Sequence, residues 1–94
     1  MKTIRIISDT HSVYEVINAD ELLTIFLDVD DEEEVVSLEC KFKGSAEDES
    51  YVIGYFFYTE EQTKDHILFN LKEALYKIQE FLSTEDKTCI VVID

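Results

Sequence analysis

The seven residues from Asp28 to Glu34 read Asp-Val-Asp-Asp-Glu-Glu-Glu and form the most acidic run in a chain of 94 residues with a formal net charge of -14. Carboxylates this close together repel one another and destabilise a compact state. An ionised carboxylate only accepts hydrogen bonds, so its chemistry is to attract a metal ion or the lysines and arginines of a partner. The run therefore indicates either a binding role or charge that keeps the protein soluble.

The twelve residues that begin at Asp28 resemble the calcium-binding loop of EF-hand proteins. In this resemblance Asp28, Asp30 and Glu32 take ligand positions near the start of the loop. Glu39 takes the last ligand position, and Glu33 replaces the glycine that makes the sharp turn. EF-hand loops lie between helices, whereas the sequence on both sides of this run alternates as strands do. We therefore expect a solvated turn here and no dedicated metal site.

The sequence Ile6-Ile7-Ser8-Asp9-Thr10-His11 resembles the opening Asp-x-His motif of calcineurin-like metallophosphoesterases. In that family the aspartate and the histidine ligate a dinuclear metal centre, so the resemblance implies a metal-binding role for Asp9 and His11. It covers only about the first dozen residues. The later Gly-Asp, Gly-Asn-His and Gly-His motifs, which supply the ligands for activating water, are absent. A phosphoesterase-like protein that uses Asp9 and His11 therefore remains an alternative.

No other catalytic arrangement can be recognised in the chain. His66 has no serine or cysteine that the sequence pairs with it, and no third group to orient it. Gly44 and Gly54 are the only glycines, too few for a phosphate-binding loop or a dinucleotide fingerprint. We therefore predict a protein that is not an enzyme and needs no cofactor.

Length and composition predict one domain over residues 1 to 94 with one modest core. Hydrophobic residues make up 46% of the chain, which favours a folded protein despite the charge.

Cys40 and Cys89 lie in apolar segments without the spacing of a zinc site, so we expect two buried thiols, with a bridge between adjacent strands as the alternative. No apolar stretch is long enough to span a membrane and no signal-peptide core follows Met1, which predicts a soluble cytoplasmic protein.

Residues 35 to 43 give the clearest structural pattern, because apolar and polar residues alternate as in a half-buried strand. Leu22 to Val29 is also strand-like, and we predict that the two segments pair antiparallel across a turn at Asp30 to Glu34. The acidic run is then the tip of a hairpin. Thr3 to Ser8 is a further strand, and Val13 to Asn18 is either its hairpin partner or a short helix.

The second half of the chain predicts two more strands and a helix. Tyr51 to Tyr58 is apolar at both alternating positions, which predicts a strand covered on both faces, by the protein itself or by a second copy in a homodimer. Residues 60 to 82 have a helical apolar period, with Thr59 and Gln62 as a capping box. A last strand follows at Thr88 to Ile93. The order predicts an α+β domain: a mainly antiparallel sheet of about five strands, one long helix (about 60–82) on a face, and a C-terminal strand.

The negative charge is concentrated in the middle of the chain, where residues 20 to 34 hold eight acids and no base. This distribution predicts a one-sided acidic surface. Eight lysines and arginines against 22 acids disfavour direct binding of nucleic acid. A basic protein that itself binds nucleic acid is a better partner, because carboxylates fixed on strands and turns can resemble phosphates to its lysines and arginines.

The predicted contact residues are three acidic groups and one aromatic anchor. They are Asp28, Asp30, Asp31, Glu32, Glu33, Glu34, Glu47, Asp48, Glu49, Glu60, Glu61 and Tyr55. We predict a small acidic inhibitor that blocks or mimics the nucleic-acid contacts of a basic partner such as a nuclease or a CRISPR or restriction effector. In composition alone the chain resembles phage and mobile-element inhibitors, including anti-CRISPR and anti-restriction proteins. The alternatives are a toxin-immunity protein and the phosphoesterase-like protein.

Overall fold

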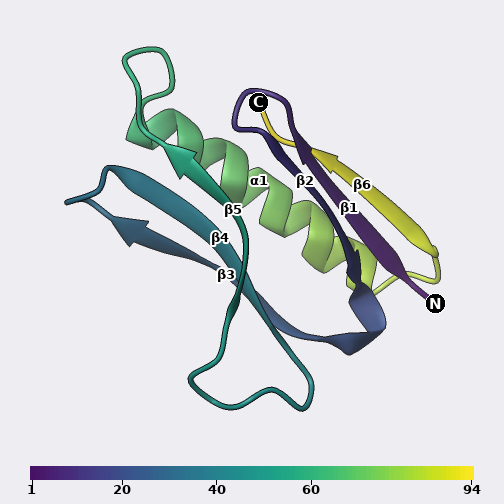
Figure 1. The fold of residues 1–94 in the computed structure, drawn as a ribbon. Helices are drawn as coiled ribbons and strands as arrows, with labels where there is room; N and C mark the ends of the chain where they lie inside the picture. Colours follow the sequence, from purple (N-terminus) through teal and green to yellow (C-terminus); the bar gives the residue numbers. More distant parts are fainter.

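The structure, a computed structural model, describes all residues from 1 to 94. The strands are β1 (Thr3–Ser8), β2 (Val13–Asn18), β3 (Leu22–Asp30), β4 (Val35–Phe42), β5 (Tyr51–Phe57) and β6 (Thr88–Val92), and the helices are the 3-10 helix η1 (Ala19–Glu21) and α1 (Lys64–Leu82). They form two three-stranded sheets with α1 packed against both (Figure 1). The predicted α+β class is confirmed, but the strands form two sheets of three and not one sheet of about five.

The first sheet, which we call sheet A, has the strand order β2-β1-β6. β1 and β2 form an antiparallel hairpin in which Thr3 lies opposite Asn18. Of the two alternatives for Val13–Asn18, the strand is therefore confirmed. β6 comes from the far end of the sequence and pairs parallel to β1, with Thr3 opposite Thr88. The first and last strands are thus neighbours.

The second sheet, sheet B, is the antiparallel meander β3-β4-β5. Its first turn is the predicted hairpin, with Asp30 opposite Val35. The Asp30 Oδ1 atom accepts hydrogen bonds from the backbone N–H groups of Glu32 and Glu33, at 3.1 and 3.2 Å, which is how an aspartate stabilises a turn. Glu34 closes the turn at a φ of 53°. The prediction that the acidic run is a hairpin tip is confirmed.

The helix α1 begins at Lys64 rather than at residue 60, and its N-cap is Thr63, whose side chain accepts the His66 N–H at 3.3 Å. The capping box predicted at Thr59 and Gln62 is wrong. The Thr59 Oγ1 atom does accept the Gln62 N–H at 2.8 Å, but the Thr59 N–H also donates to the Gln62 carbonyl, which closes a separate turn before the helix. The predicted end of the helix at Leu82 is confirmed.

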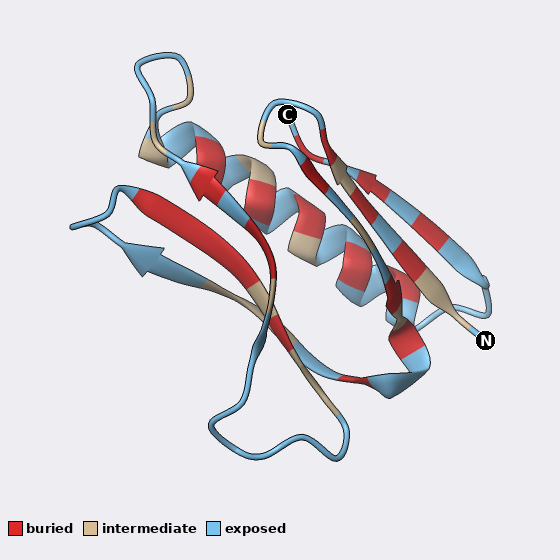
Figure 2. Ribbon diagram, in the orientation of Figure 1, coloured by how far each residue is buried: buried red, intermediate tan, exposed pale blue.

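One core lies between the helix and the inner faces of the two sheets. The helix contributes Ile67, Leu71, Ala74, Ile78 and Phe81. In Figure 2 buried and exposed residues alternate along β6, whereas β4, the central strand of sheet B, is buried along most of its length. The two cysteines are buried and free, one in each sheet, as predicted. Burial raises the pKa of the Cys40 thiol to about 11, so the thiol form dominates at neutral pH.

The two sheets meet where β2 passes β5. A Cβ atom added to Gly54 of β5 would lie 2.5 Å from Cγ2 of Val13 in β2, inside van der Waals contact. Val13 is buried and β-branched, so its side chain has little freedom to move away. The missing side chain at Gly54 is therefore what allows the sheets to approach at this point.

Candidate functional site

The face of sheet B that points away from α1 carries carboxylates beside aromatic rings. We call it the acidic face, and it consists of Phe26, Asp28 and Asp30 of β3, Val35, Ser37 and Glu39 of β4, and Tyr55 and Phe57 of β5. The strand register places Asp30, Val35 and Phe57 in one row. The next row is Asp28, Ser37 and Tyr55. Alternate residues of a strand share a face, so the two rows present acids on one edge and aromatic rings on the other.

Hydrogen bonds hold part of this face in place. Both oxygens of the Glu39 carboxylate accept side-chain hydroxyl groups, from Ser37 at 2.7 Å and from Ser50 at 2.7 Å. The rings of Tyr55 and Phe57 lie beside each other with their centroids 6.3 Å apart. The face is therefore a preformed arrangement on paired strands and not a mobile loop.

Tyr55 and Phe57 are half exposed, at 52% and 54%, while Phe56 between them is fully buried. The prediction that the protein itself covers β5 on both faces is therefore wrong. The helix covers only the inner face, and β5 is an edge strand with β4 as its single neighbour. Adjacent exposed aromatic residues are typical of protein contact sites. A homodimer through β5 stays a prediction.

The hairpin tip is tied to the start of the helix through one of its carboxylates. Asp31 Oδ1 accepts from Lys64 Nζ at 2.7 Å and from the Tyr58 hydroxyl at 3.2 Å. The Lys64 ammonium lowers the pKa of Asp31, and the pKa of Lys64 is raised in turn. The neighbouring acids Glu32 and Glu33 make no ion pair. The tip therefore has a fixed base and a charged end.

The structure brings together only some of the predicted contact residues. Asp28, Asp30 and Tyr55 share the acidic face, and the Asp31–Glu34 tip lies at its corner. The turn that carries Glu60 and Glu61 follows β5 at the same end, because Tyr58 N–H donates to the Glu34 carbonyl. Glu47, Asp48 and Glu49 lie at the opposite end of sheet B, in the loop between β4 and β5 (Figure 1). The three acidic groups are thus not one continuous array.

The lysines do little to neutralise these carboxylates. The only ion pair is Lys64 with Asp31. Four other lysines donate to backbone carbonyl groups: Lys2 to Phe81 and Leu82, Lys41 to Glu47, Lys43 to Asp20, and Lys77 to Ile90. Because these cations bind main-chain oxygens, the acidic side chains stay free to attract a positive partner. Sequence patterns do not show this, since each lysine reaches a distant part of the chain or a loop.

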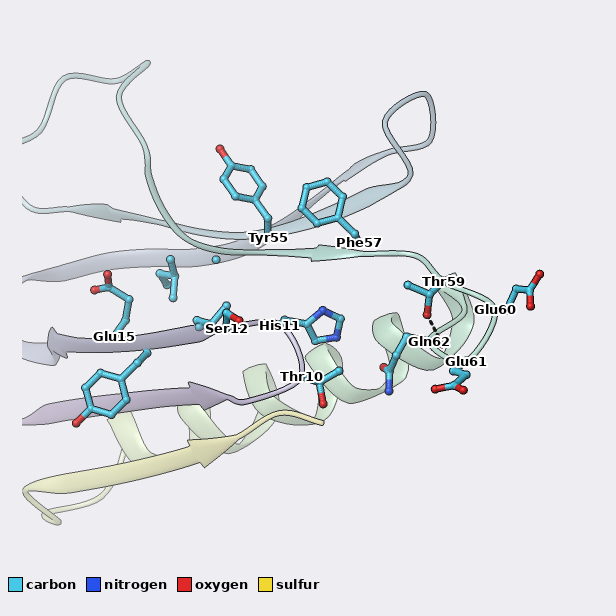
Figure 3. A pocket seen from close by; sticks show the side chains of 14 residues that line it. Thr10, His11, Ser12, Glu15, Tyr55, Phe57, Thr59, Glu60, Glu61 and Gln62 are labelled. Carbon is cyan, nitrogen blue, oxygen red and sulfur yellow. Dashed lines mark hydrogen bonds between the residues drawn. The ribbon is translucent and has the colours of Figure 1, made fainter.

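A cleft of about 930 Å³ lies between β2 and β5, next to the turn that carries Glu61 (Figure 3). The His11 ring is in its floor and packs on the Phe56 ring, with centroids 4.8 Å apart. Burial lowers the pKa of His11, and the adjacent Gln62 side chain partly opposes this shift. No hydrogen bond of normal geometry reaches His11 Nε2 or Gln62 Oε1, although both atoms are buried. The cleft therefore holds two neighbouring buried polar atoms that make no hydrogen bond of normal geometry.

The structure contains no group of three or more histidine, cysteine, aspartate or glutamate side chains placed to bind a metal ion. His11 packs on an aromatic ring, and Asp9 is exposed in the turn after β1. His66 lies in the first turn of α1, with its Nε2 atom 3.1 Å from Asn70 Nδ2. The segment compared with an EF-hand loop is flanked by β3 and β4 and not by helices.

Comparisons of this chain with protein-family models, curated proteins and solved structures find no match. The helix α1 does not combine the length and apolar character that a membrane-spanning helix needs. The acidic face and the cleft are therefore the features from which a function can be inferred.

Proposed function

We propose that the protein is a small, non-enzymatic inhibitor that binds the basic, nucleic-acid-contacting surface of a partner protein through its acidic face. The observation that carries the proposal is the register that sets Asp28 in a row with Tyr55, and Asp30 in a row with Phe57. Carboxylates provide steering and specificity toward lysine and arginine. Aromatic side chains provide most of the contact energy in protein interfaces. The acidic face offers both within two adjacent rows.

The spacing of the carboxylates supports recognition of a repeating positive surface. Asp28 and Asp30 are alternate residues of one strand, so their Cα atoms are about 7 Å apart. Glu39 adds a third carboxylate from β4, held by two hydroxyl groups. Binding to groups that are already ordered costs less conformational entropy than ordering a flexible acidic loop. A rigid array of this kind can take the place of phosphates on the partner.

The unpaired charge elsewhere on the protein supports the same role. With one ion pair in the whole structure, most carboxylates add to a long-range negative field. Such a field raises the rate at which a positively charged protein arrives, and it is weakened by salt. We assign Glu32, Glu33 and the 47–49 loop to this steering role and the acidic face to docking.

The test begins with capture of partners by the tagged protein from its native host, with identification by mass spectrometry. We expect a basic, nucleic-acid-binding protein, released from the inhibitor by competing nucleic acid. Its identity also separates this function from the toxin-immunity alternative, which would use the same electrostatics. Capture of an acidic or neutral partner, or no competition by nucleic acid, would contradict the proposal.

The captured partner then allows a matched pair of charge variants to be compared by calorimetry. Asp28→Asn with Asp30→Asn removes two charges from the acidic face. Glu85→Gln with Asp86→Asn removes two charges from the exposed turn after α1. We expect the first pair to weaken binding about tenfold and to reduce its salt dependence, and the second to change it less than about twofold. Equal effects would mean that net charge alone is recognised.

A further inference from the structure

The strand β5 presents an unpaired backbone edge to the cleft. The Tyr58 N–H donates to the Glu34 carbonyl at 2.8 Å, which fixes which residues bond to β4. Backbone hydrogen bonding alternates along an antiparallel pair, so Phe56 also bonds to β4. The N–H and C=O groups of Tyr55 and Phe57 therefore point the other way, into the cleft. Sheet B has no strand beyond β5 that could form hydrogen bonds with these groups.

The opposite wall of the cleft is a second unpaired edge. The Ala19 N–H donates to the Lys2 carbonyl at 2.9 Å. Because hydrogen bonding alternates along the strand, the backbone groups of Glu15 and Val13 also bond to β1. The backbone groups of Tyr14 therefore face away from β1. The contact between Val13 and Gly54 and the hydrogen bond from the Tyr51 hydroxyl to Glu15 Oε1, at 2.8 Å, join the two strands. Tyr55 and Phe57 line the cleft on the side of β5. An extended segment can enter there and pair with a free edge, as peptides do in strand addition.

The side chains that line the cleft offer hydrogen-bond acceptors and no cation. No lysine or arginine lines it, while Glu15, Glu60 and Glu61 do. In Figure 3 Gln62 and His11 lie near each other beside the turn that carries Glu61, and Glu60 points away from the cleft. Gln62 Oε1 accepts no hydrogen bond of normal geometry in the free protein, and one nitrogen of the neutral His11 ring beside it is also an acceptor. The chemistry missing from the cleft is a group with several N–H donors, which an arginine side chain supplies in a planar fork.

We propose that the cleft binds an extended, arginine-containing segment of the basic partner, which pairs its backbone with Tyr55 and Phe57 and places a guanidinium group against Glu61 and Gln62. The inference rests on the proposed function for the existence of that partner and adds the mode in which one segment of it docks. Continuity supports this choice of occupant. The side chains of Tyr55 and Phe57 belong to the acidic face, whereas their backbone groups border the cleft, so a partner on the face lies beside the edge.

The test uses a defined probe, the peptide acetyl-Thr-Arg-Val-Arg-Thr-amide, added to the isotope-labelled full chain at low salt. We expect the amide protons of Tyr55 and Phe57 to exchange at least about tenfold more slowly in the complex, because strand pairing protects them. A peptide with glutamate in place of arginine, and one with N-methylated backbone groups on its pairing edge, should each bind about tenfold more weakly or worse. Absence of binding by the arginine peptide would overturn the proposal.

Single substitutions locate the guanidinium group. Gln62→Leu keeps the approximate size of the side chain and removes its polar atoms, and its backbone bonds to Thr59 remain. We expect Gln62→Leu and Glu61→Gln each to weaken peptide binding about three- to fivefold. Glu85→Gln, with the same loss of charge as Glu61→Gln but far from the cleft, should change it by less than about twofold. Amide spectra of each variant show whether the fold is intact.

Two results distinguish failure of this inference from failure of the proposed function. If Glu85→Gln weakens the peptide as much as Glu61→Gln, or if the β5 amides are not protected, the cleft is not the site. The acidic face is then still tested by Asp28→Asn with Asp30→Asn against the intact partner. If the peptide protects the β5 amides but those two substitutions leave partner binding unchanged, the cleft stands and the role of the face is wrong.

Discussion

The two sheets present opposite kinds of surface on the sides that face away from α1. The acidic face of sheet B carries carboxylates and aromatic rings. The outer side of sheet A, which we call the neutral face, has no carboxylate and one charged residue, Arg5. Its members are Thr3, Arg5 and Ile7 of β1, Tyr14, Val16 and Asn18 of β2, and Thr88, Ile90 and Val92 of β6.

This difference bears on why the protein is so acidic. Tyr14 and Val92 on the neutral face are exposed at 63% and 62%, so this apolar surface is where solubilising charge would be most useful. Negative charge is absent there, whereas the acidic face of sheet B carries Asp28, Asp30 and Glu39. The placement favours acidity used for binding over acidity used for solubility. Substitutions on the two sheets test that interpretation.

Phe56 and Phe57 are neighbours in β5 that point to opposite sides of sheet B. Phe56→Ala should lower the free energy of unfolding by about 3–5 kcal/mol, because it leaves a cavity beneath a fully buried ring. Phe57→Ala should lower it by about 0.5 kcal/mol or less, while weakening partner binding. Urea unfolding of both variants measures the contrast. Similar losses of stability would show that the acidic face is part of the core.

Gly54→Ala should separate the two sheets where they meet. The added methyl group lies within 2.5 Å of the Val13 side chain, so we expect a loss of about 1–3 kcal/mol in unfolding free energy from overpacking. Adding Val13→Ala should recover part of that loss, because it removes the atoms in the clash. Thermal or urea unfolding of the single and double variants gives the coupling. If the changes in unfolding free energy of the two single variants add up to that of the double variant, the contact is contradicted.

Adding charge to the neutral face tests whether position matters more than net charge. Val16 and Ile90 flank Arg5 in one row, so Val16→Glu with Ile90→Glu should be tolerated next to the guanidinium group. We expect partner affinity to change by less than about twofold, since rim charge far from the contact mainly alters the rate of association. Calorimetry with the captured partner measures it. A large gain would favour recognition of total charge.

The smallest expected effect concerns the hairpin tip beside the acidic face. Lys64 lowers the pKa of Asp31 below its ordinary value of 3.8, so the ionised carboxylate is favoured in the folded state. Its contribution to stability is present above that value and is lost as the pH falls through the lowered pKa. Asp31→Asn should therefore lower the melting temperature slightly at neutral pH and not at all in strong acid. If the difference in melting temperature between the two proteins does not change with pH, its cause is not the ion pair.

Local patterns predicted the parts of the structure that depend on neighbours in sequence. The β3–β4 hairpin and its acidic tip follow from alternation around Asp30 to Glu34, and the helical period predicts α1 and its end at Leu82. The start of the helix was misplaced because a Thr-x-x-Gln sequence serves equally well in a separate turn. The pattern at Thr59 and Gln62 cannot distinguish these two uses of the same hydrogen bond.

Long-range geometry could not be predicted. Periodicity does not name the partner of a strand, so the pairing of β6 with β1 and the division into two sheets were inaccessible. The apolar stretch Tyr51–Tyr58 suggested burial on both faces, yet three of its five aromatic residues are exposed. Tyr55 and Phe57 are exposed because no part of the protein covers the outer face of β5. The register that unites Asp28 and Tyr55, and the cleft that contains Gln62, depend on the same tertiary arrangement.

The parallel pairing of β6 with β1 also constrains the order in which the protein folds. Thr3 and Thr88 lie side by side in sheet A, so this contact closes a loop that contains nearly the whole sequence. Closing so long a loop is entropically unfavourable until other contacts have shortened it. The β1–β2 hairpin and the β3-β4-β5 meander can form from local contacts, whereas β6 must wait for α1 to dock. The edge of β1 that pairs with β6 therefore remains unpaired until late in folding, and it is exposed to aggregation until then.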